Sequence, residues 1–317
     1  MDRPDTSPPT MMQRILASDF VFDFTRAPLA MLAAAVVLFL FIIAILAPLV
    51  APTNPFDPAS LNLMNGFTPP MTPNMFTGQS FVMGTDDQGR DLLSAIIYGL
   101  RVSLFVGVMS VLLAMGIGVS LGLVAGYVGG WLDNLIMRIA DIQLTFPSIL
   151  IAMLIFGVLR GIIPPDLRDE MAIFVLIAAI GLSEWVPFAR TVRATTLVEK
   201  EKEYVQAARL IGLRRGQIMW RHILPNVIGP VLVIATITLA LAIIAEATLS
   251  FLGVGIQPPL ADWGTMVRDL SNFINFAMIS PLTAALPLMA AGAIALLTVA
   301  VNFVVDWMLH RASGLKE

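Results

Sequence analysis

Long apolar segments alternate with short polar ones along this chain of 317 residues. An apolar run of about 20 residues is long enough to cross the hydrocarbon core of a bilayer as one helix. The pattern therefore predicts an all-α polytopic membrane protein with about six transmembrane helices. The predicted spans are residues 29–50, 102–127, 132–159, 171–189, 227–249 and 286–309, and Pro147 breaks the third of them.

The polar segments divide the chain into parts. Residues 1–28 form an N-terminal tail that we expect to stay in the cytoplasm, because the apolar run behind it is too long for a cleavable signal peptide. Residues 51–99 begin with a proline-rich stretch and form an extracytoplasmic loop. Residues 100–309 form a transmembrane core that contains a charged cytoplasmic loop at 190–225. Residues 310–317 form a cytoplasmic tail.

The distribution of positive charge predicts the side on which each loop lies, because lysine and arginine accumulate in cytoplasmic loops. With both ends of the chain inside, 14 of the 19 basic residues are cytoplasmic, and eight of these lie between 190 and 221. The basic residues that remain outside are Arg90, Arg101, Arg160, Arg168 and Arg268. We therefore predict that both termini and the charged loop are cytoplasmic.

The composition excludes several classes of function. Hydrophobic residues make up 57% of the chain and charged residues 13%, whereas soluble domains average about 45–50% and about 25%. A net charge of −3 indicates no nucleic-acid partner. The chain has no cysteine, two histidines and no Gly-x-x-x-x-Gly-Lys-Ser/Thr loop for nucleotide phosphates. We therefore predict no metal site, no cofactor and no enzymatic activity of its own.

The charged loop contains a helical pattern at residues 203–225, which we call the elbow. Gly212 interrupts the pattern, as a glycine does just past a helix end. A second short amphipathic run follows, and Pro225 is expected to stop it because proline cannot continue a helical ladder. The face expected before Gly212 has i, i+3, i+4, i+7 spacing and consists of Tyr204, Ala207, Ala208 and Ile211.

The other faces of the elbow are basic. Their arginines are Arg209, Arg214, Arg215 and Arg221. One interpretation is an amphipathic cytoplasmic loop that rests on anionic lipid headgroups. The other is a docking element, with a shallow face where the alanines let another backbone approach and with a basic rim.

The elbow resembles the signature loop of the membrane subunits of bacterial ABC importers. The matching residues are Ala207, Ala208, Gly212, Leu224 and Pro225. In that family the loop docks into a groove of an ATPase subunit. The resemblance therefore implies an ATPase-coupling role for these residues, with Arg214 and Arg215 as an electrostatic rim. Gln206 departs from the family pattern, which often has a glutamate before the two alanines.

Two further stretches are similar to the dipeptide, oligopeptide and nickel branch of these permeases, in its C-type subunit. They are GTDDQGRDLLS at 84–94, followed by Tyr98-Gly99 and RVSL at 101–104, and DIQLTFP at 141–147. The resemblance implies a type I ABC importer fold in the bacterial inner membrane. It implies a second homologous permease, two ATP-binding ATPase subunits and an extracytoplasmic solute-binding protein as partners. The implied substrates are di- or oligopeptides, with nickel or another small conjugate as the alternative.

Two local features are predicted for the second span. Asp91 is expected to lie at the start of the helix, where free N–H groups favour a carboxylate. Gly118, Gly122 and Gly126 recur every four residues on one helix face. Such spacing allows close helix packing in a bilayer, either within the chain or against a partner subunit.

The acidic residues within the spans allow an alternative of a different class. Arg138 and Asp141 are three residues apart and are expected to pair on one helix face. The alternative is an ion-coupled secondary carrier, whose relay would consist of Asp141, Glu184, Glu246 and Asp306. Trp263, which follows the fifth span, is a candidate interfacial anchor.

Overall fold

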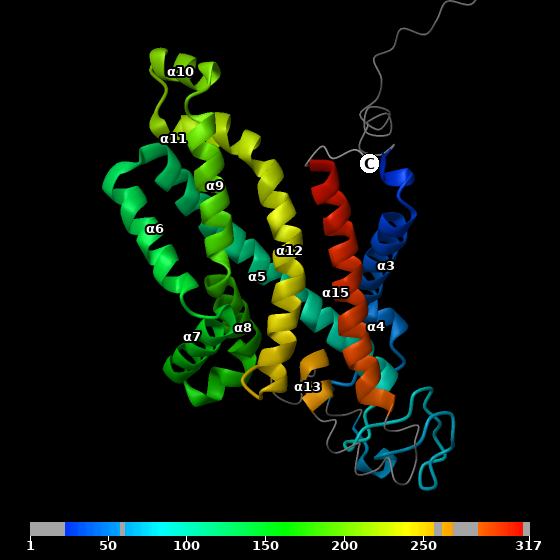
Figure 1. Cartoon of the computed structure of the whole chain (residues 1–317). Coiled ribbons are helices and arrows are strands. Elements are labelled where there is room, and N and C mark those ends of the chain that lie inside the picture. The colour runs from blue at the N-terminus through cyan, green and yellow to red at the C-terminus, as the bar shows by residue number, and fades with distance from the viewer. Residues whose placement is uncertain (1–22, 58–60, 257–261, 269–284, 313–317) are drawn as a thin grey trace, which may run out of the picture.

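The computed structural model describes residues 23–57, 61–256, 262–268 and 285–312, and every regular element in these ranges is helical (Figure 1). The all-α prediction is confirmed. Most of the two predicted tails, residues 1–22 and 313–317, lies outside the described residues. The α-helices are α3 Pro28–Ile45, α4 Ala47–Val50, α5 Leu92–Val128, α6 Gly130–Leu144, α7 Ser148–Ile162, α8 Arg168–Ser183, α9 Trp185–Glu199, α10 Glu203–Leu210, α11 Arg215–Gln217, α12 Leu224–Phe251, α13 Trp263–Arg268 and α15 Ala285–Ala312. Short 3₁₀ turns occur at Leu63–Asn65 and Pro165–Leu167, and a π-helix at Ile218–Ile223.

Three of the described helices are long and apolar enough to cross a membrane: α3, α5 and the continuous helix Arg215–Phe251. Two bent pairs, α6 with α7 and α8 with α9, raise the number to five if each pair is one span. The polytopic prediction is thus confirmed. The sixth predicted span lies in α15, whose described apolar part, Ala291–Trp307, is shorter than 18 residues, so a sixth span stays a prediction.

Prolines explain both bends. Pro147 separates α6 from α7, which meet at 99°, and this break was predicted from the sequence. Pro187 lies in the first turn of α9 and cannot donate a hydrogen bond to the carbonyl of Ser183, where α8 ends. The Gln143 side chain of α6 replaces that bond, since its Nε2 donates to the Ser183 carbonyl at 2.9 Å. Its Oε1 accepts from Nε1 of Trp185 at 2.8 Å.

The charged stretch that was predicted as a loop from residue 190 begins within a helix. α9 continues the fourth span to Glu199, so only residues 200–223 lie between α9 and α12. The second span also begins earlier than predicted, at Leu92. The N-cap position of Asp91 is confirmed, because its Oδ2 accepts a hydrogen bond from the backbone N–H of Ser94 at 3.0 Å.

The three glycines of α5 form a close seam with α9. A Cβ added at Gly118 would lie 2.5 Å from Cβ of Phe188, and one at Gly126 would lie 2.7 Å from Cβ of Thr196. A Cβ at Gly122 would lie 2.6 Å from the Ala189 carbonyl oxygen. These separations are too short for any real side chain. The small-residue face of α5 therefore packs against α9 of the same chain. Of the two alternatives left open by the sequence, packing within the chain is the observed one, and packing against a partner subunit is not.

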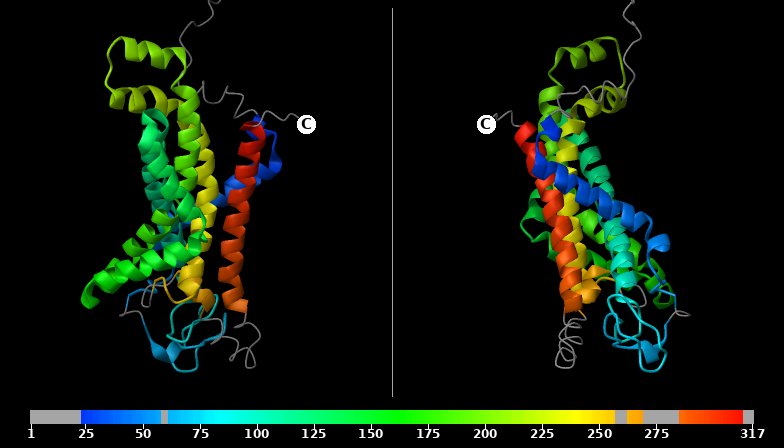
Figure 2. Two further views of the ribbon diagram at one scale, coloured as in Figure 1. Left: turned by 60° about the vertical axis from the view of Figure 1, so that its left-hand side comes forward. Right: turned by 90° about the vertical axis from the view of Figure 1, so that its right-hand side faces the viewer.

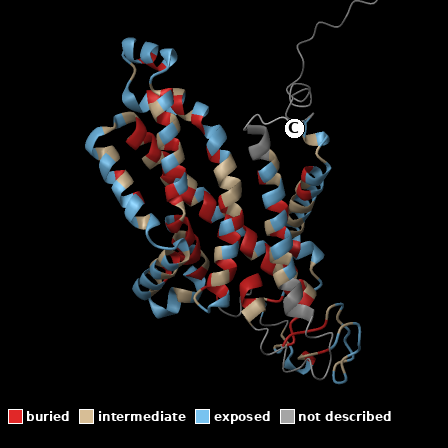
Figure 3. Cartoon of the chain, in the orientation of Figure 1, coloured by how far each residue is buried: buried red, intermediate tan, exposed pale blue. Residues whose placement is uncertain are grey.

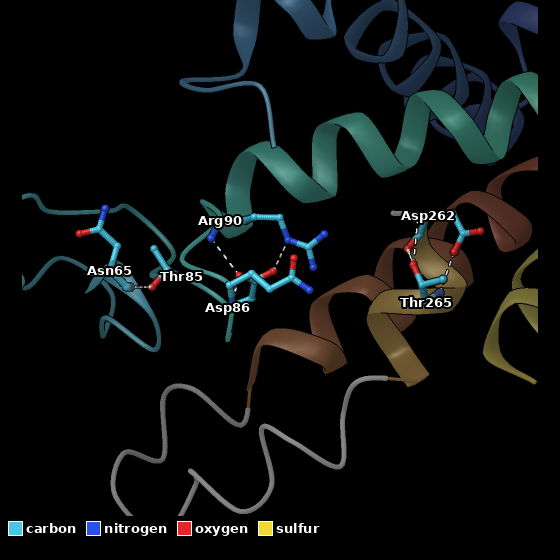
Figure 4. Close-up of polar contacts among 7 residues, drawn as sticks. Asn65, Thr85, Asp86, Arg90, Asp262 and Thr265 are labelled. Atoms are coloured by element: carbon cyan, nitrogen blue, oxygen red, sulfur yellow. Dashed lines mark hydrogen bonds and ion pairs between the residues drawn. The ribbon is translucent and has the colours of Figure 1, made fainter. Parts of the chain in front are cut away.

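Polar contacts organise the end of the molecule where α5 begins (Figure 4). One carboxylate oxygen of Asp86 accepts from the backbone N–H of Arg90 at 2.8 Å, and the other accepts from its Nε at 2.5 Å. Both side chains of this ion pair are buried. Thr85 donates its hydroxyl hydrogen bond to the Asn65 carbonyl, which joins the turn to the preceding loop.

The interpretation of Trp263 as an interfacial anchor is wrong. Its side chain is fully buried, and its Nε1 donates to the carbonyl of Ile96 in α5 at 3.0 Å. Asp262 directly precedes the short helix α13, and its Oδ1 accepts from the backbone N–H of Thr265 at 2.6 Å (Figure 4). The indole thus fastens α13 to α5, a contact between segments more than 160 residues apart that local sequence patterns do not encode.

Different elements lie at the two ends of the molecule (Figures 1 and 2). The start of α3, the end of α15 and the protruding α10 lie at one end. The loop before α5, α13 and the outer turns of α7 and α8 lie at the other. Side chains at the two ends therefore face opposite compartments when the long helices cross a bilayer.

Candidate functional site

The elbow projects beyond the long helices and joins the end of α9 to the start of α12 (Figures 1 and 2). It consists of α10, α11 and the π-helix. Its position at one tip of the molecule makes it accessible to a partner on that side.

One face of the elbow is anchored to the protein. Val205 and Ala208 of α10 are buried, and they belong to the same core cluster as Ile218, Ile223 and Val227. The predicted grouping of Tyr204, Ala207, Ala208 and Ile211 on one functional face is therefore wrong in part. Ala208 faces inward, where its small side chain lets α10 lie close to the π-helix, and the other three side chains are exposed.

The outer face of the elbow is exposed, as the pale blue colour of α10 in Figure 3 indicates, and it carries large apolar side chains. Leu210 is 88% exposed and Ile211 76% exposed. Trp220 and Ala207 are also exposed. Large apolar side chains held in the open on an ordered helix are typical of a surface that binds another protein.

Gly212 ends α10 as predicted. Its φ is +82°, in the left-handed region that favours glycine. Its N–H donates to the Arg209 carbonyl at 3.0 Å, and the N–H of Leu213 donates to the Ala208 carbonyl at 3.2 Å. This pair of bonds is a Schellman motif, which fixes the direction of the chain after the helix.

Pro225 does not stop the helix, so that prediction is wrong. It lies in the first turn of α12, and the helix is continuous from Arg215 to Phe251. A proline lacks the N–H for the ladder and its ring crowds the carbonyl four residues earlier. The wider π turns at Ile218–Ile223 fall directly before the proline and accommodate it.

A polar network that was not predicted from the sequence holds the base of the elbow. The Glu199 carboxylate accepts from Nζ of Lys202 and from the Tyr204 hydroxyl, both at 2.5 Å. The Tyr204 hydroxyl in turn accepts from Nδ2 of Asn226 at 3.2 Å. The end of α9, the start of α10 and the start of α12 are thereby linked. Partial burial and the bond to Glu199 raise the pKa of Tyr204 to about 12, so the phenol stays a donor at neutral pH.

Tyr204→Phe is expected to loosen the elbow without unfolding the protein. The variant removes the hydrogen bond to Glu199 and the one from Asn226, and because Tyr204 is partly exposed we expect their loss to cost about 1 kcal/mol. Amide hydrogen exchange in α10 should then become about fivefold faster, while exchange in α5 stays unchanged. Identical exchange in α10 of the variant and the native chain would contradict a structural role for the network.

The helix behind the elbow is fastened to α6 by ion pairs. Arg193 donates to both carboxylate oxygens of Asp133, at 2.5 and 2.7 Å. Arg190 pairs with Asp141, so the predicted pair of Asp141 with Arg138 is wrong. Arg190 of the neighbouring helix α9 is thus the partner of Asp141, in place of Arg138 from the same helix. Together with the glycine seam, these contacts join α9 to α5 and α6.

Two of the arginines of the elbow, Arg209 and Arg215, line a cavity of about 400 Å³ together with Tyr127 at the end of α5. The Arg209 guanidinium lies 5.1 Å from the ring centroid of Tyr127. Arg214 precedes α11, and it is exposed, as are Arg209, Arg215 and Arg221. Leu224 is half-buried and Pro225 exposed at the start of α12, so these two shape the elbow's exit and lie away from its outer tip.

Comparison with known proteins identifies this arrangement. A family model described as the inner membrane component of binding-protein-dependent transport systems matches residues 118–313, which is more than half of the chain. The chain belongs to this family. The N-terminal part of the permease, residues 16–70, matches a model for the N-terminal transmembrane domain of oligopeptide transport permease C.

Individual relatives place the permease in the same branch. It is 36% identical to the oligopeptide transport system permease protein OppC of Bacillus subtilis over 254 residues, covering 80% of this chain and 77% of the relative. It is 36% identical to the dipeptide transport system permease protein DppC of Haemophilus influenzae, covering 86% and 87%. It is 37% identical to the glutathione transport system permease protein GsiD of Escherichia coli, covering 79% and 77%.

Membership of this family decides between the classes of function weighed above. The permease is a multi-pass inner-membrane component of an ABC transporter of the OppC and DppC type, and ATP hydrolysis resides in separate subunits of such transporters. The ABC transporter therefore takes precedence over the alternative, in which the acidic residues form the relay of an ion-coupled carrier. Asp141 forms an ion pair with Arg190, and Glu246 is fully buried beside Asp262, Ser103 and Ser250.

Proposed function

We propose that the permease forms part of the translocation pathway for di- or oligopeptides, or for a small peptide conjugate such as glutathione. The relatives named for these substrates cover most of this chain, which favours them over nickel. A solute-binding protein delivers the substrate on the extracytoplasmic side. A second, homologous permease subunit completes the pathway, and two ATPase subunits supply the energy.

The orientation follows from charge and shape together. The elbow and the segment 190–221 carry eight of the 19 basic residues, which favours the cytoplasm for this end. The start of α3 and the end of α15 lie at the same end (Figure 1), which supports a cytoplasmic position for both termini. The loop before α5 then faces the extracytoplasmic side.

The observation that carries the coupling role is an exposed apolar face on a rigid elbow. Leu210 and Ile211 form its tip and enter a groove of the ATPase subunit. Ala207 keeps the surface beside them shallow, and Ala208 and Gly212 fix α10 in place. The exposed guanidinium groups of Arg214 and Arg215 form the rim, where they meet acidic groups of the partner.

This assignment predicts selective loss of the ATPase in the double variant Leu210→Asp/Ile211→Asp. Two large apolar side chains contribute about 3–6 kcal/mol when buried, so binding should weaken at least ~100-fold. The chain is purified in mild detergent together with its co-expressed partners, and the co-purifying subunits are identified. The double variant should keep the second permease and lose the ATPase subunits and ATP-driven uptake.

Met75→Asp is the matched control. Met75 is 97% exposed in the loop at the opposite end. Its substitution therefore also replaces an exposed apolar side chain by aspartate, but away from the elbow. We expect this variant to retain both partners. Recovery of the native chain alone would refute the proposed assembly, and an ATPase that stays bound to the double variant would refute the docking site.

A further inference from the structure

A cavity with a cationic lining lies at the end of the molecule opposite the elbow. Its volume is about 330 Å³. It lies between α7, α8 and the turn that follows α12, a region seen at the lower left of Figure 1. Its lining consists of Phe156, Gly157, Arg160, Gly161, Arg168 and Val254.

The two arginines are held in place, and neither is paired with an acid among the described residues. Nε of Arg168 donates to the Ile163 carbonyl at 3.1 Å, which orients the guanidinium. The Arg160 guanidinium lies 5.9 Å from the ring centroid of Phe156. Both side chains are half-buried. Acids of the neighbouring turn do not contribute to the cavity, because Asp166, Asp169 and Glu170 are exposed and absent from its lining.

The wall of the cavity on α7 is open to a ligand. Gly157 and Gly161 are one turn apart, and no atom lies within 4 Å of the position that a Cβ would take at either. The next face of α7 carries a stripe of exposed apolar side chains with a spacing of four residues. The stripe consists of Leu150, Leu154, Val158 and Ile162. The cavity therefore lies beside an apolar surface of α7 that the described residues leave uncovered.

Two guanidinium groups in one cavity match a carboxylate, because each presents a planar set of N–H donors. Ligand pockets typically enclose about 300–1,000 Å³, so this volume at the low end admits one terminal residue and not a whole peptide. We propose that Arg160 and Arg168 form a subsite for the C-terminal carboxylate of the peptide when it enters from the extracytoplasmic side. The subsite rests on the proposed peptide transport.

Binding to the complete transporter tests the subsite without the solute-binding protein. The probes are N-acetyl-alanine and its amide, which differ only in the carboxylate, and saturation-transfer difference NMR reports millimolar binding. The native transporter should bind the acid at least tenfold more tightly than the amide. Arg160→Gln/Arg168→Gln should remove this preference, while the lysine double variant keeps part of it because it keeps the charge.

Arg101→Gln is the control, since Arg101 lies on the same side of the molecule in α5, outside this cavity. It should preserve the tenfold preference. Equal binding of acid and amide by the native transporter overturns the subsite, as does a preference that survives in the glutamine double variant. If the arginine pair instead docks an acidic surface of the solute-binding protein, the native transporter should bind the acid and the amide equally. The glutamine double variant should then lose the solute-binding protein.

Uptake separates failure of the subsite from failure of the proposed function. ATP-driven uptake of tri-alanine is measured with the native transporter and its solute-binding protein. Uptake without a preference for the acid probe overturns the subsite alone. An acid preference without uptake of any peptide overturns the assignment of peptides as the substrate. Uptake by the native transporter with a raised KM in the glutamine double variant supports both.

Discussion

A permease that carries Gly122→Ala is expected to unfold far more easily than the native chain. The added Cβ would lie 2.6 Å from the Ala189 carbonyl oxygen, 2.8 Å from Cβ of Val192 and 3.1 Å from Cα of Ala189. Two of these atoms belong to the backbone of α9, so no flexible side chain can move aside. Overpacking of this kind typically costs about 1–3 kcal/mol, and we expect the upper end because two long helices must separate.

The measurement is the midpoint of thermal unfolding of the transporter in detergent. Gly116→Ala is the control, because Gly116 lies in the same helix and has no atom within 4 Å of a Cβ position. Alanine favours a helix over glycine by about 0.5–1 kcal/mol, so this variant should keep or raise the midpoint. An equal loss in both variants, or none at Gly122, would show that the seam does not limit stability.

Gly212→Val is expected to abolish ATP-driven uptake while the chain still inserts and folds. Gly212 has a φ of +82°, and a residue with a Cβ pays about 1–2 kcal/mol there, with more for a β-branched one. Crowding plays no part, because no atom lies within 4 Å of the Cβ position. The Schellman motif should open, and Leu210 and Ile211 should lose their fixed direction. We expect uptake to fall at least ~20-fold.

Gly212→Asn provides the matched comparison, because asparagine tolerates the left-handed region better than other side chains. It should keep most of the uptake. Both variants should unfold at the native midpoint, since the change lies outside the long helices. Native uptake by the valine variant would remove Gly212 from the coupling residues, and equal loss in both variants would indicate that the site does not tolerate bulk of any kind.

The long helices could be predicted from the sequence because a bilayer imposes one simple requirement on every span. Apolar length identified all the segments that became α3, α5, α8 and α12, and Pro147 marked the bend between α6 and α7. The glycine spacing of α5 predicted close packing. It could not name α9 as the partner, because the complementary surface of α9 has no comparable pattern.

The elbow was predicted less completely. Gly212 marked the end of α10 because backbone conformation there depends on the residue itself. The prediction of which side of α10 packs against the protein was wrong in part. α10 has only eight residues, and the side that packs depends on Ile218 and Ile223 in the next element. The role of Pro225 was missed for a related reason. A π-helix before a proline removes the steric conflict, and no local rule predicts its presence.

The continuity of the helix beyond the elbow has a mechanical consequence. α12 has 28 residues, and at 1.5 Å per residue it is a rod of about 42 Å. A tilt of about 10° imposed at its elbow end moves the other end sideways by about 7 Å, which is the width of a large side chain. A modest rotation at the elbow would thus be amplified by leverage into a larger sideways displacement at the far end of α12.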